Sequence, residues 1–260
     1  MTGHFKRVFI GSNLKMYKTN QQNLSYLSQL LELTKDISRS NLTLFILPSY
    51  TALAEMLRMA NHSEILIGAQ NMHWEDSGAY TGEISPPMLK ELGVDLVMLG
   101  HAERRSIFGE TDRMVNRRIL ASLAHGFITL VCVGDTTEDM TFGVSEERLR
   151  QQIKTALHGV DSSLFDKLWV AYEPVWAIGT GGRPADPEFA SHMHRSIRNA
   201  LNEIFPDHPN SIPILYGGSV NLENCAALIN QPEIDGLFIG RAAWDAENFN
   251  RIIRSVLPAL

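Results

Sequence analysis

The chain has 260 residues, of which 44% are hydrophobic and 20% are charged. This composition excludes an intrinsically disordered protein and is sufficient for a large buried core. A formal charge of -6 without any run of Lys or Arg excludes a basic surface for nucleic acid. Cys132 and Cys225 stand in neither a metal-ligand nor a disulfide spacing, and no apolar stretch is long enough to cross a bilayer. We therefore predict a cytoplasmic protein that binds neither nucleic acid nor membrane.

Short aliphatic or β-branched runs alternate with longer amphipathic stretches, and no low-complexity linker interrupts them. Nearly continuous apolar runs are typical of parallel strands that are covered on both faces. The predicted strands are Val8–Ile10, Leu42–Leu47, Ile65–Ala69, Leu96–Leu99, Ile128–Val133, Leu168–Tyr172, Ile212–Tyr216 and Leu237–Ile239. Eight βα units in this length predict a closed (β/α)8 TIM barrel, with residues 1–260 as a single domain. The alternative is an open, doubly wound sheet, but no Gly-x-Gly-x-x-Gly follows the first strand.

The stretch 172–182 combines an apolar strand end, an acidic residue and a glycine-rich loop. Glu173 follows the sixth predicted strand, and Pro174 prevents a helix from starting there. Gly179, Gly181 and Gly182 supply backbone freedom and N–H groups that can approach an anion. A glutamate beside glycines is by itself more often a solvated turn. Together with the residues that follow other strands, it predicts a catalytic base beneath a lid.

Polar residues also follow other predicted strands. Asn13 and Lys15 follow the first strand, and His101 follows the fourth. Because a barrel carries its active site where the strands end, these side chains are expected to meet Glu173 at one mouth. The seventh and eighth strands are followed by glycine-containing loops whose N–H groups suit a phosphate. The predicted phosphate-binding residues are Asn13, Lys15, Gly179, Ser219, Gly240 and Arg241.

Sequence blocks near the strand ends are spread over the whole chain. They are Asn13-x-Lys15-Met16, Gly68-Ala69-Gln70-Asn71, Gly78-Ala79-Tyr80-Thr81-Gly82-Glu83, Gly100-His101-x-Glu103-Arg104-Arg105, Cys132-Val133-Gly134, the Glu173 lid and Tyr216-Gly217-Gly218-Ser219-Val220-Asn221. Through these blocks the whole chain resembles the triosephosphate isomerase family. The resemblance implies interconversion of an aldose phosphate with its ketose phosphate through an enediolate, without metal or organic cofactor. It also implies a homodimer in which Thr81 reaches the partner's active site near Asn13, and a contact from Glu103 that supports Lys15.

The chemistry of moving a carbonyl by one carbon requires the same residue types. A base must take a proton from the adjacent carbon, and a donor must stabilise the oxyanion that forms. Glu173 suits the first task, and a neutral His101 suits the second because an imidazolium would release its proton too early. Lys15 can neutralise charge on the substrate oxygens. Closure of the lid over Val175 to Gly179 would exclude water.

Several residues near the site depart from the usual family pattern. Leu14 stands where the family usually has Trp, Tyr17 where Asn is usual, and Ala102 where Ser is usual. That Ser gives the base a partner in the open state, so Glu173 is expected to rest differently here. The far hinge of the lid reads 182–184 as Gly-Arg-Pro instead of the usual Lys-Thr or Lys-Ser followed by Ala.

The eighth loop departs most. The family usually presents a Gly-Gly pair to the phosphate, whereas this chain has Gly240-Arg241, and Phe238 replaces a Leu that usually presses on the base. This pattern is similar to that of the tetrulose-phosphate isomerases, although Asn13 favours the triose branch. We therefore predict a small phosphorylated sugar as substrate, first a triose phosphate and alternatively an erythrulose phosphate. A third hypothesis is an inactive barrel that binds a phosphorylated ligand.

Overall fold

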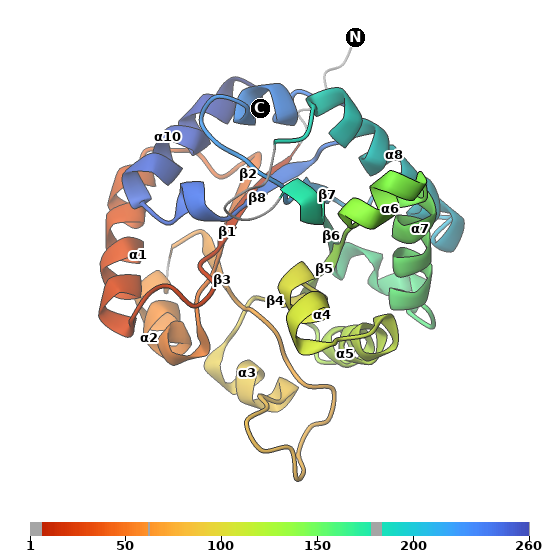
Figure 1. Ribbon diagram of the computed structural model, residues 1–260. Coiled ribbons are helices and arrows are strands. Elements are labelled where there is room, and N and C mark those ends of the chain that lie inside the picture. Colours follow the sequence, from red (N-terminus) through yellow and green to blue (C-terminus); the bar gives the residue numbers. More distant parts are fainter. Residues whose placement is uncertain (1–6, 62, 178–183, 260) are drawn as a thin grey trace.

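The computed structural model describes residues 7–61, 63–177 and 184–259. Within these ranges, eight parallel strands pair in chain order and close into a barrel, with β8 beside β1 (Figure 1). The predicted (β/α)8 barrel is therefore confirmed. The strands are β1 (Val8–Asn13), β2 (Leu42–Leu47), β3 (Ile65–Ala69), β4 (Leu96–Leu99), β5 (Ile128–Val133), β6 (Leu168–Tyr172), β7 (Ile214–Tyr216) and β8 (Gly236–Ile239).

Helices surround the barrel as an outer ring (Figure 1). The α-helices in the described ranges are α1 (Asn20–Thr34), α2 (Tyr50–Ala60), α3 (Pro86–Leu92), α4 (Ala102–Phe108), α5 (Asp112–Ala124), α6 (Thr137–Phe142), α7 (Ser145–Ala156), α8 (Pro187–Ile204), α9 (Cys225–Ile229) and α10 (Ala246–Val256). Short 3-10 turns are η1 (Ser162–Lys167), η2 (Val175–Ala177), η3 (Arg241–Ala243) and η4 (Leu257–Ala259). None of the described helices is long and apolar enough to cross a membrane.

Three strands differ from their predicted bounds. β1 continues past Ile10 because its pairing with β2 runs on to Asn13 opposite Leu47. β7 begins two residues later than predicted, since Pro213 has no N–H to donate to a ladder. β8 gains Gly236, which pairs with both β1 and β7. Asn13 therefore ends a strand and does not follow one.

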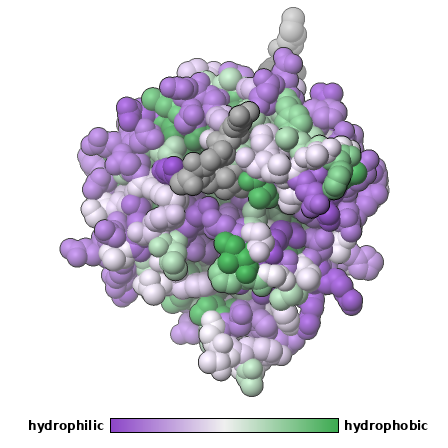
Figure 2. Space-filling model, viewed as in Figure 1, coloured by the Kyte–Doolittle hydropathy of each residue, from purple (hydrophilic) through white to green (hydrophobic). Residues whose placement is uncertain are grey.

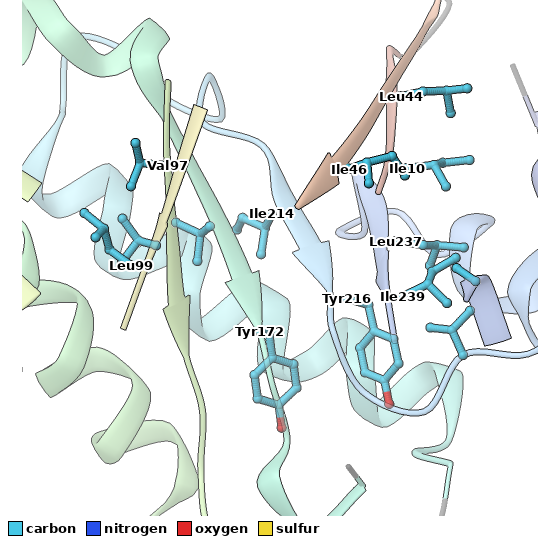
Figure 3. Packing of buried hydrophobic residues seen from close by; sticks show 14 of the residues in the cluster. Ile10, Leu44, Ile46, Val97, Leu99, Tyr172, Ile214, Tyr216, Leu237 and Ile239 are labelled. Carbon is cyan, nitrogen blue, oxygen red and sulfur yellow. The ribbon is translucent and has the colours of Figure 1, made fainter. Parts of the chain in front are cut away.

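The core has two layers because side chains alternate along each strand. Along β2, Leu44 and Ile46 belong to the large cluster that also contains the buried faces of the surrounding helices. Figure 3 shows these side chains with others of the same cluster from neighbouring strands. Phe45 and Leu47 belong to a smaller cluster with Trp169 of β6 and other strand residues. Both faces of the sheet are thus covered, as the apolar runs predicted.

The loop that leads from β3 to α3 extends away from the ring of helices, at the bottom of Figure 1. His73 in this loop stacks between Trp74 and Tyr80, with ring centroids 4.2 and 4.3 Å away. The His73 N–H also donates to the carbonyl oxygen of Ile84 at 2.8 Å. The loop therefore has a small core of its own, and Thr81 lies exposed beyond it.

Candidate active site

Glu173 directly follows β6 and is only 2% exposed. One carboxylate oxygen, Oε2, accepts a hydrogen bond from the Ala102 N–H at 2.9 Å. The other, Oε1, lies 3.1 Å from His101 Nε2. A Cβ added at Gly217 would stand 3.1 Å from Glu173 Cγ, so a glycine at that position keeps the space that the glutamate occupies. The main chain and a second strand end therefore hold this carboxylate.

The carboxylate of Glu173 is stabilised in its ionised form. Burial is the largest single influence and raises the pKa of Glu173, but the electrostatic contact and hydrogen bond with His101 lower that pKa. The Ala102 N–H and the Lys15 cation act in the same direction, and the pKa of Glu173 lies below its usual range. At neutral pH the group can therefore accept a proton.

His101 lies between the end of β4 and the start of α4. Gly100 reaches this turn with a φ of 78°, in the left-handed region that favours glycine. His101 is the N-cap of α4, and its Nδ1 accepts the N–H of Glu103 at 3.2 Å. A nitrogen that accepts a hydrogen bond carries no proton, so this contact selects the neutral tautomer with the proton on Nε2. The N–H that results faces Glu173 and the cavity.

Lys15 has a strained backbone. Its φ of 51° lies in the left-handed region, where residues other than glycine are uncommon. Two side chains hold it: Asn13 Oδ1 accepts the Lys15 N–H at 2.8 Å, and the Gln70 amide donates to the Lys15 carbonyl at 2.9 Å. The Lys15 ammonium lies 2.5 Å from Glu103 Oε1, which is the contact that the resemblance implied.

A cavity of about 440 Å³ opens beside these groups. It brings together every predicted site residue that the structure describes; Gly179 lies outside the described residues. Among the described residues, no group of three or more His, Cys, Asp or Glu side chains is placed to hold a metal ion. The predicted residues that line the cavity are Asn13, Lys15, His101, Glu103, Glu173, Ser219, Gly240 and Arg241, and the others include Tyr17, Gly217, Gly218, Phe238 and Trp244.

Asp135 follows β5 and is a buried residue that the sequence analysis missed. Its Oδ1 accepts the Tyr172 hydroxyl at 2.9 Å, and its Oδ2 accepts the Ser145 hydroxyl at 2.7 Å and the Trp176 indole N–H at 3.2 Å. The Asp135 carbonyl accepts the Val175 N–H at 2.9 Å. Asp135 thus fixes the chain immediately after the base, where the predicted lid begins.

The fold and the site define a barrel isomerase with a glutamate beside a neutral histidine. The chain matches the sequence model of the family described as triosephosphate isomerase over residues 8–256. It belongs to that family and is an isomerase of the aldose–ketose type.

The similar proteins carry two different names. The chain is 45% identical to L-erythrulose-1-phosphate isomerase of Rhizobium etli, over 97% of this chain and 94% of that protein. It is 43% identical to L-erythrulose-1-phosphate isomerase of Mesorhizobium japonicum, over 97% and 98%. It is also 41% identical to triosephosphate isomerase of Caldanaerobacter subterraneus, over 95% and 99%. Membership of the family alone therefore leaves two substrates to compare.

Proposed function

We propose that the protein isomerises a ketose phosphate by moving a proton between adjacent carbons through an enediolate. Glu173 takes the proton, and the Nε2–H of His101 stabilises the oxyanion and transfers protons between the two oxygens. The approach of Glu173 Oε1 to His101 Nε2, at 3.1 Å beside the cavity, is the observation that carries this proposal. A glutamate base with a neutral histidine electrophile is the arrangement known for triosephosphate isomerase itself.

Lys15 and Asn13 complete the proposed chemistry at the first loop. The Lys15 ammonium lies at the cavity wall with 18% of its side chain exposed, so it can reach the oxygens of a bound substrate. The carboxylate of Glu103 is the ion-pair partner that keeps this cation in place. Its role is therefore to position Lys15, because the 2.5 Å contact fixes where the positive charge acts.

The phosphate is expected to lie at the seventh and eighth loops. Gly217, Ser219, Gly240 and Arg241 line the cavity, and the N–H groups of such glycine-containing loops suit an anion. A Cβ added at Gly240 would meet nothing within 4 Å, so this position is open to a ligand. Gly179 stays a predicted phosphate-binding residue of the lid.

We favour an erythrulose phosphate as the substrate, although the sequence alone placed a triose phosphate first. The relatives at 45% and 43% identity carry the four-carbon name. In a four-carbon ketose 1-phosphate, a hydroxymethyl group replaces one hydrogen of the carbon that loses its proton. Ala102, whose N–H donates to the Glu173 carboxylate at 2.9 Å, is one departure from the family pattern beside the base. Phe238 in the cavity wall is the second departure on this side.

A triose phosphate is the second candidate. Asn13, which the triose branch carries at this position, lines the cavity, and a relative at 41% identity is a triosephosphate isomerase. The two candidates share the base, the electrophile and the cation. They differ only in what the site must accommodate on the carbon that Glu173 attacks.

We further propose a cytoplasmic homodimer. Loop 70–85 extends from the barrel with Thr81 exposed near its end (Figure 1). Large apolar side chains are exposed after β1 and at the end of α4, including Met16 at 93%, Ile107 at 70% and Phe108 at 65%. Figure 2, viewed in the same direction as Figure 1, shows apolar residues among polar ones near the centre of this face. A second copy of this chain, whose Thr81 would approach Asn13, is the partner that covers them. Sedimentation at micromolar concentration tests this, and a monomer would contradict it.

The decisive assay compares kcat/KM for glyceraldehyde 3-phosphate and for the erythrulose phosphates with one preparation. We expect the four-carbon value to exceed the three-carbon value by at least tenfold, and the Glu173→Gln variant to lose turnover of both. A triose value near the diffusion limit of about 10⁸ M⁻¹s⁻¹ would instead establish the second candidate. Binding of these phosphates without turnover, unchanged in Glu173→Gln, would identify an inactive binding barrel.

A further inference from the structure

Trp244 lies in the eighth loop but touches the first one. Its indole Nε1–H donates to the carbonyl oxygen of Asn13 at 2.9 Å, across a sequence separation of 231 residues. Its ring packs on Tyr17, with centroids 4.2 Å apart and planes inclined by 36°. Both rings line the active-site cavity. The contact therefore joins the loops that follow β1 and β8 at the mouth of the barrel.

The hydrogen bond falls where the barrel ladder stops. The last pair between β1 and β8 is Ser12 with Ile239, whereas the pairing of β1 with β2 continues to Asn13. On the β8 side, the Asn13 carbonyl lies one residue beyond this ladder. The Trp244 indole supplies the donor that a longer β8 would have supplied. It thus extends the support of β1 to the residue that precedes the Leu14–Lys15 turn.

That turn needs support because Lys15 is strained. The left-handed φ of Lys15 persists only where surrounding contacts determine it. Asn13 is itself one of these contacts, since its side chain accepts the Lys15 N–H. Fixing the Asn13 main chain consequently fixes the origin of that hydrogen bond. Trp244 on the β8 side and Gln70 on the β3 side hold the segment from opposite directions.

The same contact lies at a loop that departs from the usual family pattern. Position 14 carries a buried Leu instead of the usual Trp, and position 17 carries Tyr instead of the usual Asn. A tryptophan reaches this loop from position 244 instead, and Tyr17 is the ring on which it packs. Tyr17 is 68% exposed and lines the cavity. Tyr17 and Trp244 thus form one ring contact between the first and eighth loops.

We infer that Trp244 is a positioning residue that holds Asn13 and Lys15 in place for the substrate, through its N–H and through Tyr17. The inference rests on the proposed function, in which Lys15 carries the charge that meets the substrate oxygens. Trp244 is assigned no chemical step. Loss of its support displaces the Lys15 ammonium, and a small misplacement of such a group reduces the rate strongly.

The test separates the indole N–H from the ring. Trp244→Phe keeps a ring for Tyr17 and removes the donor, whereas Trp244→Leu removes both. We expect KM, and the dissociation constant of inorganic phosphate measured by ³¹P NMR titration, to rise about three- to tenfold in Trp244→Phe, and more in Trp244→Leu. Trp169→Phe is the matched control, because Trp169 packs inside the barrel on Phe9 and Phe45; it should leave both constants within twofold of wild type.

A double-mutant cycle distinguishes positioning from general stability. In a Lys15→Ala background, adding Trp244→Phe should change kcat/KM and phosphate affinity by less than twofold, because the group that Trp244 positions is already gone. Equal losses in both backgrounds, or an unchanged Trp244→Phe variant, would overturn the inference. If the wild type turns over neither sugar phosphate, the proposed function fails, and the phosphate titration alone then decides whether Trp244 supports Lys15.

Discussion

Replacing Asp135 by Ala should destabilise the barrel substantially. The carboxylate is fully buried and accepts three donors, from Tyr172, Ser145 and Trp176. The alanine variant leaves these donors without their acceptor. The Tyr172 and Ser145 hydroxyls are buried, while Trp176 is partly exposed and its N–H can reach water. The two buried hydroxyls therefore account for most of the expected loss of stability.

The magnitude follows from these two hydroxyls. Each buried donor left without a partner costs about 1–3 kcal/mol, and removing a buried carboxylate returns part of that cost because its desolvation is relieved. We therefore expect a net loss of about 3 kcal/mol for Asp135→Ala, or roughly 6–12 °C in Tm for a domain of this size. Asp135→Asn keeps an acceptor oxygen, and the hydroxyls can reorient toward it. It should lose about 1 kcal/mol.

Thermal unfolding followed by circular dichroism measures both variants against the wild type at one protein concentration. Trp176→Phe is the matched control: it removes the exposed donor and leaves the Tyr172 and Ser145 bonds to Asp135 intact, so its Tm should stay within about 3 °C of wild type. A Tm for Asp135→Ala within 2 °C of wild type would show that the three bonds do not stabilise the fold, and would refute this reasoning.

Three further predictions concern the base and a buried ion pair. The pKa of Glu173 lies below its usual range, so loss of activity by its protonation is expected only below about pH 4.3. The measurement is kcat/KM as a function of pH, corrected for the ionisation of the substrate phosphate near about pH 6. A corrected kcat/KM that already falls above about pH 6 as the pH is lowered would contradict this. Gly217→Ala places a methyl group 3.1 Å from Glu173 Cγ and should lower kcat/KM at least tenfold in steady-state assays; full activity would argue that the base can shift without loss. Glu110→Gln removes a carboxylate 2.9 Å from the buried Arg118 guanidinium and should cost about 3 kcal/mol in chemical denaturation, and an unchanged midpoint would sink that expectation.

The sign of the Glu173 effect on stability follows from the same shift. A carboxyl whose pKa is lowered by folding stabilises the native state above its ordinary pKa of about 4.3. That contribution disappears as the pH falls through the lower pKa of the folded state. Glu173→Gln should therefore reduce the dependence of unfolding free energy on pH in the acid range, below about pH 4.3.

The strands could be predicted where an apolar run and its ladder have the same limits. β2 and β5 begin and end as predicted because turn residues bound continuous apolar runs that pair along their whole length. β7 could not be placed as well. Ile212 is apolar and buried, yet it lies outside the ladder, because Pro213 interrupts the donors. Burial and pairing are different properties, and hydrophobicity reports only the first.

The site shows the same division. Glu173 and His101 were predictable because each follows its strand directly, and a closed parallel barrel brings all strand ends to one mouth. Arg104 also forms an ion pair with Glu110, with Nε and Oε1 2.5 Å apart. Asp135 was missed because its side-chain partners lie 10, 37 and 41 residues away in the sequence. No local pattern marks a residue whose partners come from two distant segments.

The two buried thiols of the chain can report how often the folded barrel opens. Burial, and secondarily the charge of Glu173, raise the pKa of Cys132, while burial raises the pKa of Cys225. Both side chains are fully buried, so in the native state each sulfur is protonated and shielded from reagents. A thiol reagent can reach Cys132 only when the strands around it separate. The rate of labelling at that residue therefore counts the openings of the barrel, under native conditions and without denaturant.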